Sequence, residues 1–465
     1  MQKRMPGLWL DGLPAIEPRH ALDGPAEADV VIVGAGFTGL WTAYYLRKLD
    51  PGRSVIVLEA ETAGFGASGR NGGWCSAELP SGLTGLARRH GRQAAVDLQL
   101  AAVDTLDEVA RVTREEGIDC GLSRGGVRVL ARTPAQLDRL RRAKAVRERF
   151  GFGDDHFRLL DAARTAEHLD AAGVLGSAYS PHCAVLDPAR LARGLAEAAE
   201  RHGAVLRERT RVERILPGLV RTGRGDVRAG VVVRATEGFT ASLPGAGRAL
   251  APFYSYMIAT APLPESFWRQ AGWRDRAAVA DLCAHFTYLQ RTADDRIALG
   301  GRGVGYPWRS RVSPAREQAP AVWRRLTETL LTLFPGLPGP LITHRWGGPL
   351  ITHRWGGPLA ATFDFTPYVG FDRDEGLAWA GGYGGDGVAL TNLAGRTLAQ
   401  LIAGIDGPET RLCWVGARPR HWPPEPLRWL GINAGSALAH TADRYEERTG
   451  RRLPVVGGLL ESLLG

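Results

Sequence analysis

The chain has 465 residues, of which 44% are hydrophobic and 23% are charged. At roughly 100–200 residues per domain, this length predicts two or three globular domains with ample core. The net charge of +9 comes from 58 Lys and Arg against 49 Asp and Glu, but the basic residues form no long run and no nucleic-acid motif. Nucleic acid is therefore not an expected partner.

The cysteines and the N-terminal segment indicate the cellular compartment in which the protein is expected. The five cysteines are scattered, odd in number and without a CxxC pair, which argues against a disulfide scaffold or a zinc site. The basic N-terminus lacks the apolar core of a secretory signal, because Asp11, Pro14 and Glu17 interrupt it. No apolar run approaches about 18 residues, the length that spans a membrane. We therefore expect a cytoplasmic protein with no metal site and no membrane span.

The first predicted unit is a strand, a helix and a second strand. Residues 30–33 (VVIV) form a short β-branched run typical of a buried parallel strand. A helix is expected over 38–49, where the DPG tripeptide at 50–52 stops it. Residues 54–58 (SVIVL) predict the second strand, which completes one βαβ unit.

The turn of this unit carries a GxGxxG motif, Gly34-Ala35-Gly36-Phe37-Thr38-Gly39. It follows a strand and opens a helix, which is the context that dinucleotide binding requires. Gly34 permits the tight turn, Gly36 lets the backbone approach a pyrophosphate, and Gly39 allows close helix–strand packing. The helix N-terminus near Thr38 offers N–H groups and a positive dipole to the phosphates.

A carboxylate stands where an adenosine ribose would be bound. Glu59 ends the second strand, with Ala60 after it, and can accept hydrogen bonds from ribose hydroxyls. No second GxGxxG occurs in a strand–helix context. A flavoprotein that takes electrons from a pyridine nucleotide is therefore not expected, and a bound FAD would take them from an organic substrate.

Further elements follow along the chain. They are expected as helices at 92–116 and 134–149, strands at 127–131, 204–215 and 227–235, and a strand–loop–helix unit at 377–404. Asp187-Pro188 predicts a helix start, with Asp as N-cap and Pro at the first position. Residues 250–365 are rich in aromatics and alternating strands, and a helical stretch is expected to end near Arg448.

One segment is duplicated. PLITHRWGG occurs at 340–348 and again, identically, at 349–357. If the duplication is genuine, one copy must bulge out as a loop or shift a strand register. The sequence does not determine which copy takes the position in the fold.

The motifs resemble a known family. VVIVGAGFTGLWTAYYL and VIVLEAETAGFGASGRNGGWCSAELPSG resemble the D-amino-acid-oxidase-like (DAO) superfamily of FAD oxidoreductases, in the branch that contains γ-glutamylputrescine oxidoreductase. DPARLARGLAEAAERHGA, HRWGG…TFDFTPYVG and GLAWAGGYGGDGVALTNLAGRTLAQLI extend the resemblance to about residue 430. It implies an α/β (α+β) fold, in which a β-sheet substrate domain is inserted into a Rossmann-like FAD-binding domain.

The expected domains are discontinuous in sequence. The FAD-binding domain is expected at 1–75, 185–245 and 366–415, the substrate domain and its helical insert at 76–184 and 246–365, and a C-terminal helical tail at 416–465.

The resemblance also implies cofactor contacts. Along the pyrophosphate and flavin it places Gly66, Ala67, Ser68, Arg70, Asn71 and Gly72. Val212 would contact the adenine side through its backbone, and Ala235 and Thr236 would end a strand near the ADP moiety, although Glu237 stands where the family often has Gly or Asn. The loop near the flavin pyrimidine would be Gly384, Gly385, Asp386, Gly387 and Val388. Some relatives bind FAD through a cysteine before a TxDxxP-like segment; here HRWGGPLAATFDFTP has none, so non-covalent FAD is expected.

Few side chains are needed for amine oxidation, because the flavin accepts the hydride at N5 and the protein positions the C–H bond of a neutral amine. The candidate catalytic residues are Tyr256, Tyr288, Trp355, Arg354 and Tyr383. Neighbouring or duplicated alternatives are Tyr254, His353, His344, Arg345 and Trp346. Aromatic walls would hold an aliphatic amine, and arginine would hold a carboxylate. Each aromatic side chain could equally belong to the core, and Arg354 to a structural ion pair.

The leading hypothesis is an FAD-dependent oxidoreductase that converts an amine or amino acid to an imine, with O2 as the acceptor that reoxidises the flavin. The alternatives are an amine dehydrogenase with another acceptor and a flavin-binding protein with little catalysis. Some relatives use a lysine beside the flavin to promote reaction with oxygen. Here Lys3, Lys48 and Lys144 lie outside the site motifs, so in an oxidase another cation must act there.

Overall fold

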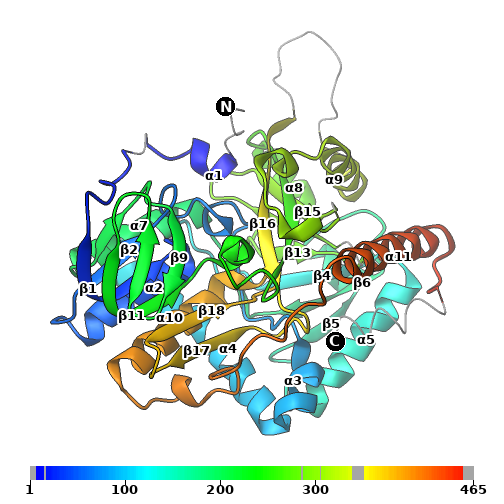
Figure 1. Ribbon diagram of the computed structural model, residues 1–465. Coiled ribbons are helices and arrows are strands. Elements are labelled where there is room, and N and C mark those ends of the chain that lie inside the picture. Colours follow the sequence, from blue (N-terminus) through cyan, green and yellow to red (C-terminus); the bar gives the residue numbers. More distant parts are fainter. Residues whose placement is uncertain (1–6, 15–16, 284–285, 304, 338–349, 454–465) are drawn as a thin grey trace.

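Two eight-stranded sheets form the frame of the computed structural model, which describes residues 7–14, 17–283, 286–303, 305–337 and 350–453. The sheets stand beside each other in Figure 1, and strands that are distant in sequence lie together in each. The predicted mixed α/β class, with a Rossmann-like sheet and a second inserted sheet, is confirmed.

The first sheet has the order β17-β18-β11-β1-β2-β8, and β9 and β10 extend it beside β11. The bounds are β1 Ala26–Val33, β2 Val55–Leu58, β8 Val205–Arg207, β9 Val212–Leu216, β10 Leu219–Thr222, β11 Val227–Arg234, β17 Tyr368–Asp372 and β18 Leu377–Gly381. β1 is central and pairs in parallel with both β2 and β11. Its last four residues are buried, as the apolar run predicts for a parallel strand covered on both faces.

Helices α2 (Phe37–Leu49), α7 (Pro188–Arg201) and α10 (Gly387–Ala403) pack on this sheet. α4 (Arg92–Glu115) packs on α10, and α3 (Gly82–His90) packs on α4. α2 packs directly on α10, where a Cβ on Gly395 would collide with Trp41. The predicted N-cap at Asp187 is confirmed, because its carboxylate accepts the N–H groups of Ala189 and Arg190 at 2.9 and 3.0 Å.

The second sheet has the order β16-β12-β15-β14-β13-β4-β6-β5. The bounds are β4 Val127–Ala131, β5 Arg158–Asp161, β6 Gly176–Ser180, β12 Ala251–Thr260, β13 Ala278–Ala280, β14 Thr287–Arg291, β15 Ile297–Arg302 and β16 Ile351–Ala361. The remaining helices are α1 Leu8–Asp11, α5 Pro134–Arg149, α6 Ala162–Ala166, α8 Glu265–Ala271, α9 Pro320–Leu333 and α11 Leu427–Thr449. α9 lies on one face of β12 and β15, and a two-stranded sheet of β3 (Trp74–Ser76) and β7 (Cys183–Val185) completes the fold.

Most predicted elements fall within a residue or two of the observed ones, but the segment 204–215 is divided. β8 ends at Arg207 and β9 begins at Val212. Between them the buried carboxylate of Glu208 accepts N–H groups from Arg19 and Ala63, and Arg209 has a left-handed φ of 50°. A buried carboxylate with fixed donors bends the chain away from the ladder at this point.

The second copy of PLITHRWGG supplies strand β16, which pairs with β12 from Ile351 to Ala361. The first copy, residues 340–348, lies outside the described residues. In the part of the chain that the structure covers, no helix combines the length and apolarity needed to cross a membrane.

Candidate active site

The GxGxxG turn has the shape that the sequence predicts. Gly34 has a φ of 105°, and a Cβ there would lie 2.5 Å from the carbonyl oxygen of Ala235. A Cβ on Gly39 would collide with the carbonyl oxygen of Gly34. Gly36 caps α2 without a side-chain hydrogen bond, and the N–H of Phe37 donates to Oγ of Ser68 at 2.8 Å. The helix N-terminus therefore meets the loop at 66–72 with little side-chain cover.

Glu59 is fixed beside this turn. Its carboxylate accepts the N–H groups of Ala35 at 2.8 Å and Glu61 at 3.0 Å, while burial raises its pKa. The N–H of Thr210 donates to the carbonyl of Glu59 at 2.8 Å, which brings the segment leading to Val212 alongside. A glycine-lined turn, a helix N-terminus with glycine as its N-cap and a buried carboxylate fit the ADP half of FAD.

The other implied contacts on this sheet lie close by. Ala235 continues β11 and donates its N–H to the carbonyl of Val33 at 2.9 Å. Thr236 follows, and its hydroxyl bonds that of Thr240 at 2.8 Å. Ala60 continues the chain from Glu59. These residues surround the Gly34 turn, as the resemblance implies; their role as cofactor contacts stays a prediction.

The loop at 66–73 is held by its own polar groups. Asn71 donates to the carbonyls of Ala67 and Ser68 at 3.1 and 3.0 Å and accepts the N–H of Gly73 at 2.7 Å. Arg70 forms a buried ion pair with Glu317, with 3.0 Å between Nη1 and Oε2 and both side chains under 10% exposed. The charge of Arg70 is therefore balanced by a residue that precedes α9, which connects the loop to the second sheet.

One face of the second sheet stands against this loop. That face carries Tyr288, Ser255 and Trp355. Trp355 pairs in register with Met257, and Tyr288 pairs with Gly300, which is itself the partner of Met257. Because in-register partners point to the same side of a sheet, these side chains share one face, together with Ser255 two residues before Met257. Tyr288 bonds the hydroxyl of Ser255 at 2.7 Å, and a Cβ on Gly72 would collide with its ring. Trp355 donates from Nε1 to the carbonyl of Arg70 at 2.8 Å. The two aromatic candidates thus meet the predicted flavin loop.

Other candidates lie apart from that face. Tyr256 lies on the opposite face, in the core under α9, and its hydroxyl donates to the carbonyl of Arg316 at 2.7 Å; Tyr254 stacks beside it. Alternation along β16 directs Arg354 away from the face that carries Trp355. The duplicated alternatives His344, Arg345 and Trp346 fall outside the described residues.

The glycine loop before α10 is anchored on both sides. Tyr383 is buried, and its hydroxyl bonds Oγ1 of Thr38 at 3.0 Å. Glu237 accepts the N–H of Gly382 at 3.0 Å, and burial raises the pKa of Glu237 to about 7. Gly384 and Gly385 have φ values of 61° and 121°, which favour glycine. Asp386 is the N-cap of α10 and makes no side-chain cap bond; Gly387 and Val388 begin the helix.

Arg302 is a site residue that the sequence reasoning missed. It ends β15 opposite Ser255 and donates from Nη2 to the carbonyl of Gly384 at 2.9 Å. Its guanidinium lies 4.9 Å from the ring centres of both Phe253 and Phe286. The alternation of the segment IALGGR placed Arg302 and Gly300 on one face, but only the register with β12 shows that this face meets the glycine loop.

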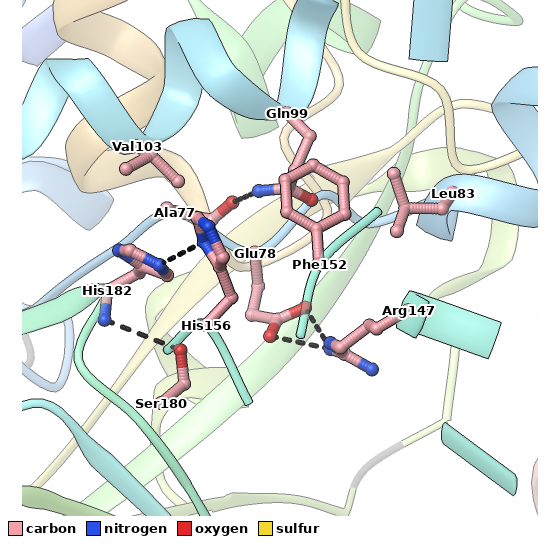
Figure 2. A pocket seen from close by; sticks show the side chains of 10 residues that line it. All are labelled: Ala77, Glu78, Leu83, Gln99, Val103, Arg147, Phe152, His156, Ser180 and His182. Atoms are coloured by element: carbon pink, nitrogen blue, oxygen red, sulfur yellow. Dashed lines mark hydrogen bonds and ion pairs between the residues drawn. The ribbon is translucent and has the colours of Figure 1, made fainter. Parts of the chain in front are cut away.

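A pocket with several polar side chains lies at Ala77 and Glu78, shortly before Pro80 in the chain (Figure 2). It is lined in part by Glu78, Arg147, His156 and His182. Arg147 pairs with Glu78 at 2.8 Å, and Nδ1 of His156 lies 2.7 Å from Nε2 of His182. Burial, followed by the charge of His156, lowers the pKa of His182. Pro80, two residues after Glu78, lies against Gly384. The pocket is therefore near the candidate active site but is not part of it.

Asp386 gives a prediction on pH and stability. Burial, reinforced by the charge of Glu78 and opposed by Arg302, raises the pKa of Asp386 to about 7. A carboxyl group whose pKa is higher in the folded than in the unfolded protein destabilises the fold increasingly as pH rises through that interval. Asp386→Asn should therefore be more stable than the wild type at pH 8, by about 1–3 kcal/mol, with a smaller gain at pH 5. Urea unfolding of both proteins at the two pH values measures this; an equal difference at both would contradict it.

Comparison with known proteins agrees with this geometry. The family model described as DAO, FAD-dependent oxidoreductase, matches residues 29–401. γ-Glutamylputrescine oxidoreductase of Escherichia coli (strain K12) is 30% identical over 392 residues, which cover 83% of this chain and 86% of that protein. The probable oxidoreductase OrdL of Haemophilus influenzae is 28% identical over 389 residues, covering 82% and 84%.

Solved structures share the fold. Glycine oxidase from Geobacillus kaustophilus superposes with a TM-score of 0.67 at 22% identity and covers 82% of this chain and 96% of its own. L-Proline dehydrogenase from P. horikoshii has a TM-score of 0.65 at 20% identity, with coverages of 84% and 96%.

Proposed function

The chain belongs to the DAO family of FAD-dependent oxidoreductases, and from that premise we propose that it oxidises the C–N bond of a small-molecule amine or amino acid to an imine. The imine would then hydrolyse to a carbonyl compound, and O2 would reoxidise the flavin. Related proteins named γ-glutamylputrescine oxidoreductase and glycine oxidase act on polyamine-derived and amino-acid substrates. We also propose the domain boundaries given above and a cytoplasmic location, which the five free cysteines favour.

The observation that carries the proposal is the face of the second sheet with Tyr288, Ser255 and Trp355, which stands against the loop at 66–73. Bound FAD supplies a two-electron acceptor for a hydride. The residues that would hold it non-covalently are those of the glycine turn, Glu59, the loop at 66–73 and the loop before α10. Cys75, next to that loop, is buried, and burial raises the pKa of its thiol to about 12, so the thiol is a small core side chain.

The chain's own residues have two tasks in this reaction. The aromatic side chains of Tyr288 and Trp355 exclude water and restrict the approach of the amine carbon. Asp386 is the N-cap residue of α10, makes no side-chain cap bond and follows the exposed Gly385. We propose that this carboxylate, whose pKa is raised by burial, takes the proton that an ammonium substrate must lose before its C–H bond is oxidised. No further acid–base group is required.

Anaerobic mixing with a panel of amines and amino acids tests the proposal. We expect bleaching of the flavin absorbance by at least one member, and none by the alcohols of matching carbon skeleton. If no amine or amino acid in a broad panel bleaches a fully FAD-loaded protein, the proposed reaction is wrong.

The second candidate function is a dehydrogenase with another electron acceptor. It is favoured by the position of the described lysines, because neither of them lies beside the flavin loops, where a lysine would promote reaction with oxygen. Lys48 bonds Tyr44 at 3.1 Å, and Lys144 pairs with Glu148 at 3.0 Å, both on helices away from the site. Admitting air to the bleached protein decides between the two. Fast recolouring with one peroxide per flavin indicates an oxidase, and slow recolouring that an artificial dye accelerates indicates a dehydrogenase.

A further inference from the structure

A short helix near the N-terminus, α1, lies between the two sheets (Figure 1). It contacts α7, which packs on the first sheet, and Trp355 in β16 of the second. Leu8 and Trp9 are buried, with 8% and 4% of their surface exposed, and Oδ2 of Asp11 lies 3.1 Å from Nε2 of His353. The residues that match the family model begin at 29, so α1 is a feature of this chain outside the matched region.

Trp9 holds a carbonyl of the predicted flavin loop. Its Nε1 donates to the carbonyl oxygen of Asn71 at 2.8 Å, and its ring stands edge-on to that of Trp355, with 6.3 Å between the ring centres. Trp355 makes the same kind of bond one residue earlier, to the carbonyl oxygen of Arg70 at 2.8 Å. An indole N–H can only donate, so two side chains from outside the loop fix two consecutive carbonyl groups.

The peptide unit between Asn71 and Gly72 has a second polar group. A peptide bond is planar and trans, so the N–H of Gly72 points away from the side on which Trp9 holds the carbonyl. Gly72 is buried, and within the part of the chain that the structure describes its N–H donates to no protein atom. Buried N–H groups without a partner are rare and costly. This N–H is therefore available to a ligand.

The position of this peptide unit along the loop indicates which half of FAD it would meet. Oγ of Ser68 accepts the N–H of Phe37 at the glycine turn, where the ADP half is expected. Four residues later the loop has reached the second sheet, because the carbonyl of Gly72 accepts from Nε2 of Gln290 at 2.6 Å and a Cβ on Gly72 would collide with the ring of Tyr288. The isoalloxazine half is expected on that side.

We propose that Trp9 is a positioning residue for the cofactor, which fixes the N–H of Gly72 so that it donates to the isoalloxazine half of FAD. The bond to the carbonyl of Asn71 keeps the peptide unit from rotating. A donor that is already held in place loses little freedom when its ligand binds. The inference depends on FAD as the cofactor and not on the identity of the amine. It gives the N-terminal segment a part in the cofactor site.

The first experiment separates the two halves of the cofactor. Trp9→Phe keeps an aromatic ring beside Trp355 and removes the N–H donor. Full-length protein freed of flavin is titrated with FAD and, separately, with ADP, and binding is followed by calorimetry. We expect the Kd of FAD to rise about 10-fold in the variant, as for the loss of one buried hydrogen bond, and the Kd of ADP to stay unchanged. An unaltered affinity for FAD, or equal weakening of FAD and ADP, would overturn the proposal.

The second experiment observes the loop directly. Hydrogen exchange of the same full-length proteins, read by mass spectrometry, follows fragments that cover residues 66–76. We expect these amides to exchange about 10-fold faster in Trp9→Phe than in the wild type, because the loop opens more readily without the bond. Adding FAD to the wild type should slow them. If the variant exchanges at the wild-type rate, Trp9 does not hold the loop and the proposal is wrong, even where the affinity for FAD has fallen.

Trp429→Phe is the matched control for both experiments. Trp429 is 38% exposed on α11, so the same change removes an indole at a distance from the flavin loop. This variant should behave as the wild type in both assays. If it weakens FAD as much as Trp9→Phe does, the effect is not specific to Trp9 and the proposal is wrong. A wild type that binds no FAD at all would instead disprove the cofactor site itself, so the two failures are distinguishable.

Discussion

A protein with Gly39→Ala is expected to purify almost colourless. The added Cβ would collide with the carbonyl oxygen of Gly34 and crowd Ile32 at 3.1 Å. Backbone cannot move aside as a flexible side chain can, so α2 must shift away from β1 and the turn that approaches the pyrophosphate opens. We expect a loss of about 3 kcal/mol in cofactor affinity, or roughly 100-fold in Kd. Flavin content per protein and titration of the apoprotein with FAD, followed by fluorescence, measure it.

Gly435→Ala is the matched control. Gly435 lies within α11, and a Cβ there meets no atom within 4 Å. Alanine is the better helix former by about 0.5–1 kcal/mol, so this variant should bind FAD normally and be slightly more stable. Wild-type FAD content in Gly39→Ala would show that the cradle at 34–39 does not determine cofactor binding.

The second large effect is expected from the buried ion pair between Arg70 and Glu317. Arg70→Met leaves the carboxylate of Glu317 buried without its guanidinium partner, and such a change costs about 3–5 kcal/mol. It also removes the bond from Nη1 to the carbonyl of Gly356, which lies in the strand beside Trp355. The loop at 66–73 should loosen from the second sheet, so FAD affinity should fall together with stability. Urea unfolding and FAD titration of the same preparations give both quantities.

The double variant Arg70→Met/Glu317→Gln separates charge from packing. Because it leaves no unpaired charge, it should be more stable than Arg70→Met alone by about 1–3 kcal/mol. If the double variant instead loses as much free energy of unfolding as the two single variants together, the pair contributes through packing only. Arg141→Met, which breaks an exposed pair with Asp138, is the control and should change stability by less than about 1 kcal/mol.

The elements of secondary structure were predictable because their signals are local. The run at 30–33, the GxGxxG turn and the Asp187 cap each depend on residues within a few positions of one another. The helix at 134–149 was predicted with the bounds that α5 has. The exception, the break at 208–211, arises from a long-range contact, since Glu208 is held by Arg19, which is 189 residues away.

Some residues of the candidate site were likewise predictable from local sequence, and others depended on long-range contacts. The glycine turn, Glu59 and the loop at 66–72 follow the chain closely enough for a motif to reveal them. The aromatic candidates come from separate strands, and whether a side chain faces the flavin loop or the core depends on strand pairing. A shift of one residue exchanges the two faces, so Tyr256 and Tyr288 were indistinguishable from sequence, although they lie on opposite sides of one sheet.

By itself, the sequence determined that this chain folds a βαβ unit around a dinucleotide, because that property resides in contiguous residues whose backbone freedom and charge are sufficient to specify it. That the dinucleotide is FAD followed from the resemblance of the longer motifs to the DAO family. The tertiary structure alone decided which copy of the duplicated segment forms β16, which aromatic residues meet the flavin loop, and that Arg302 lies beside it. Each of these depends on the register between strands that are tens of residues apart, and register is set by the packing of the whole sheet.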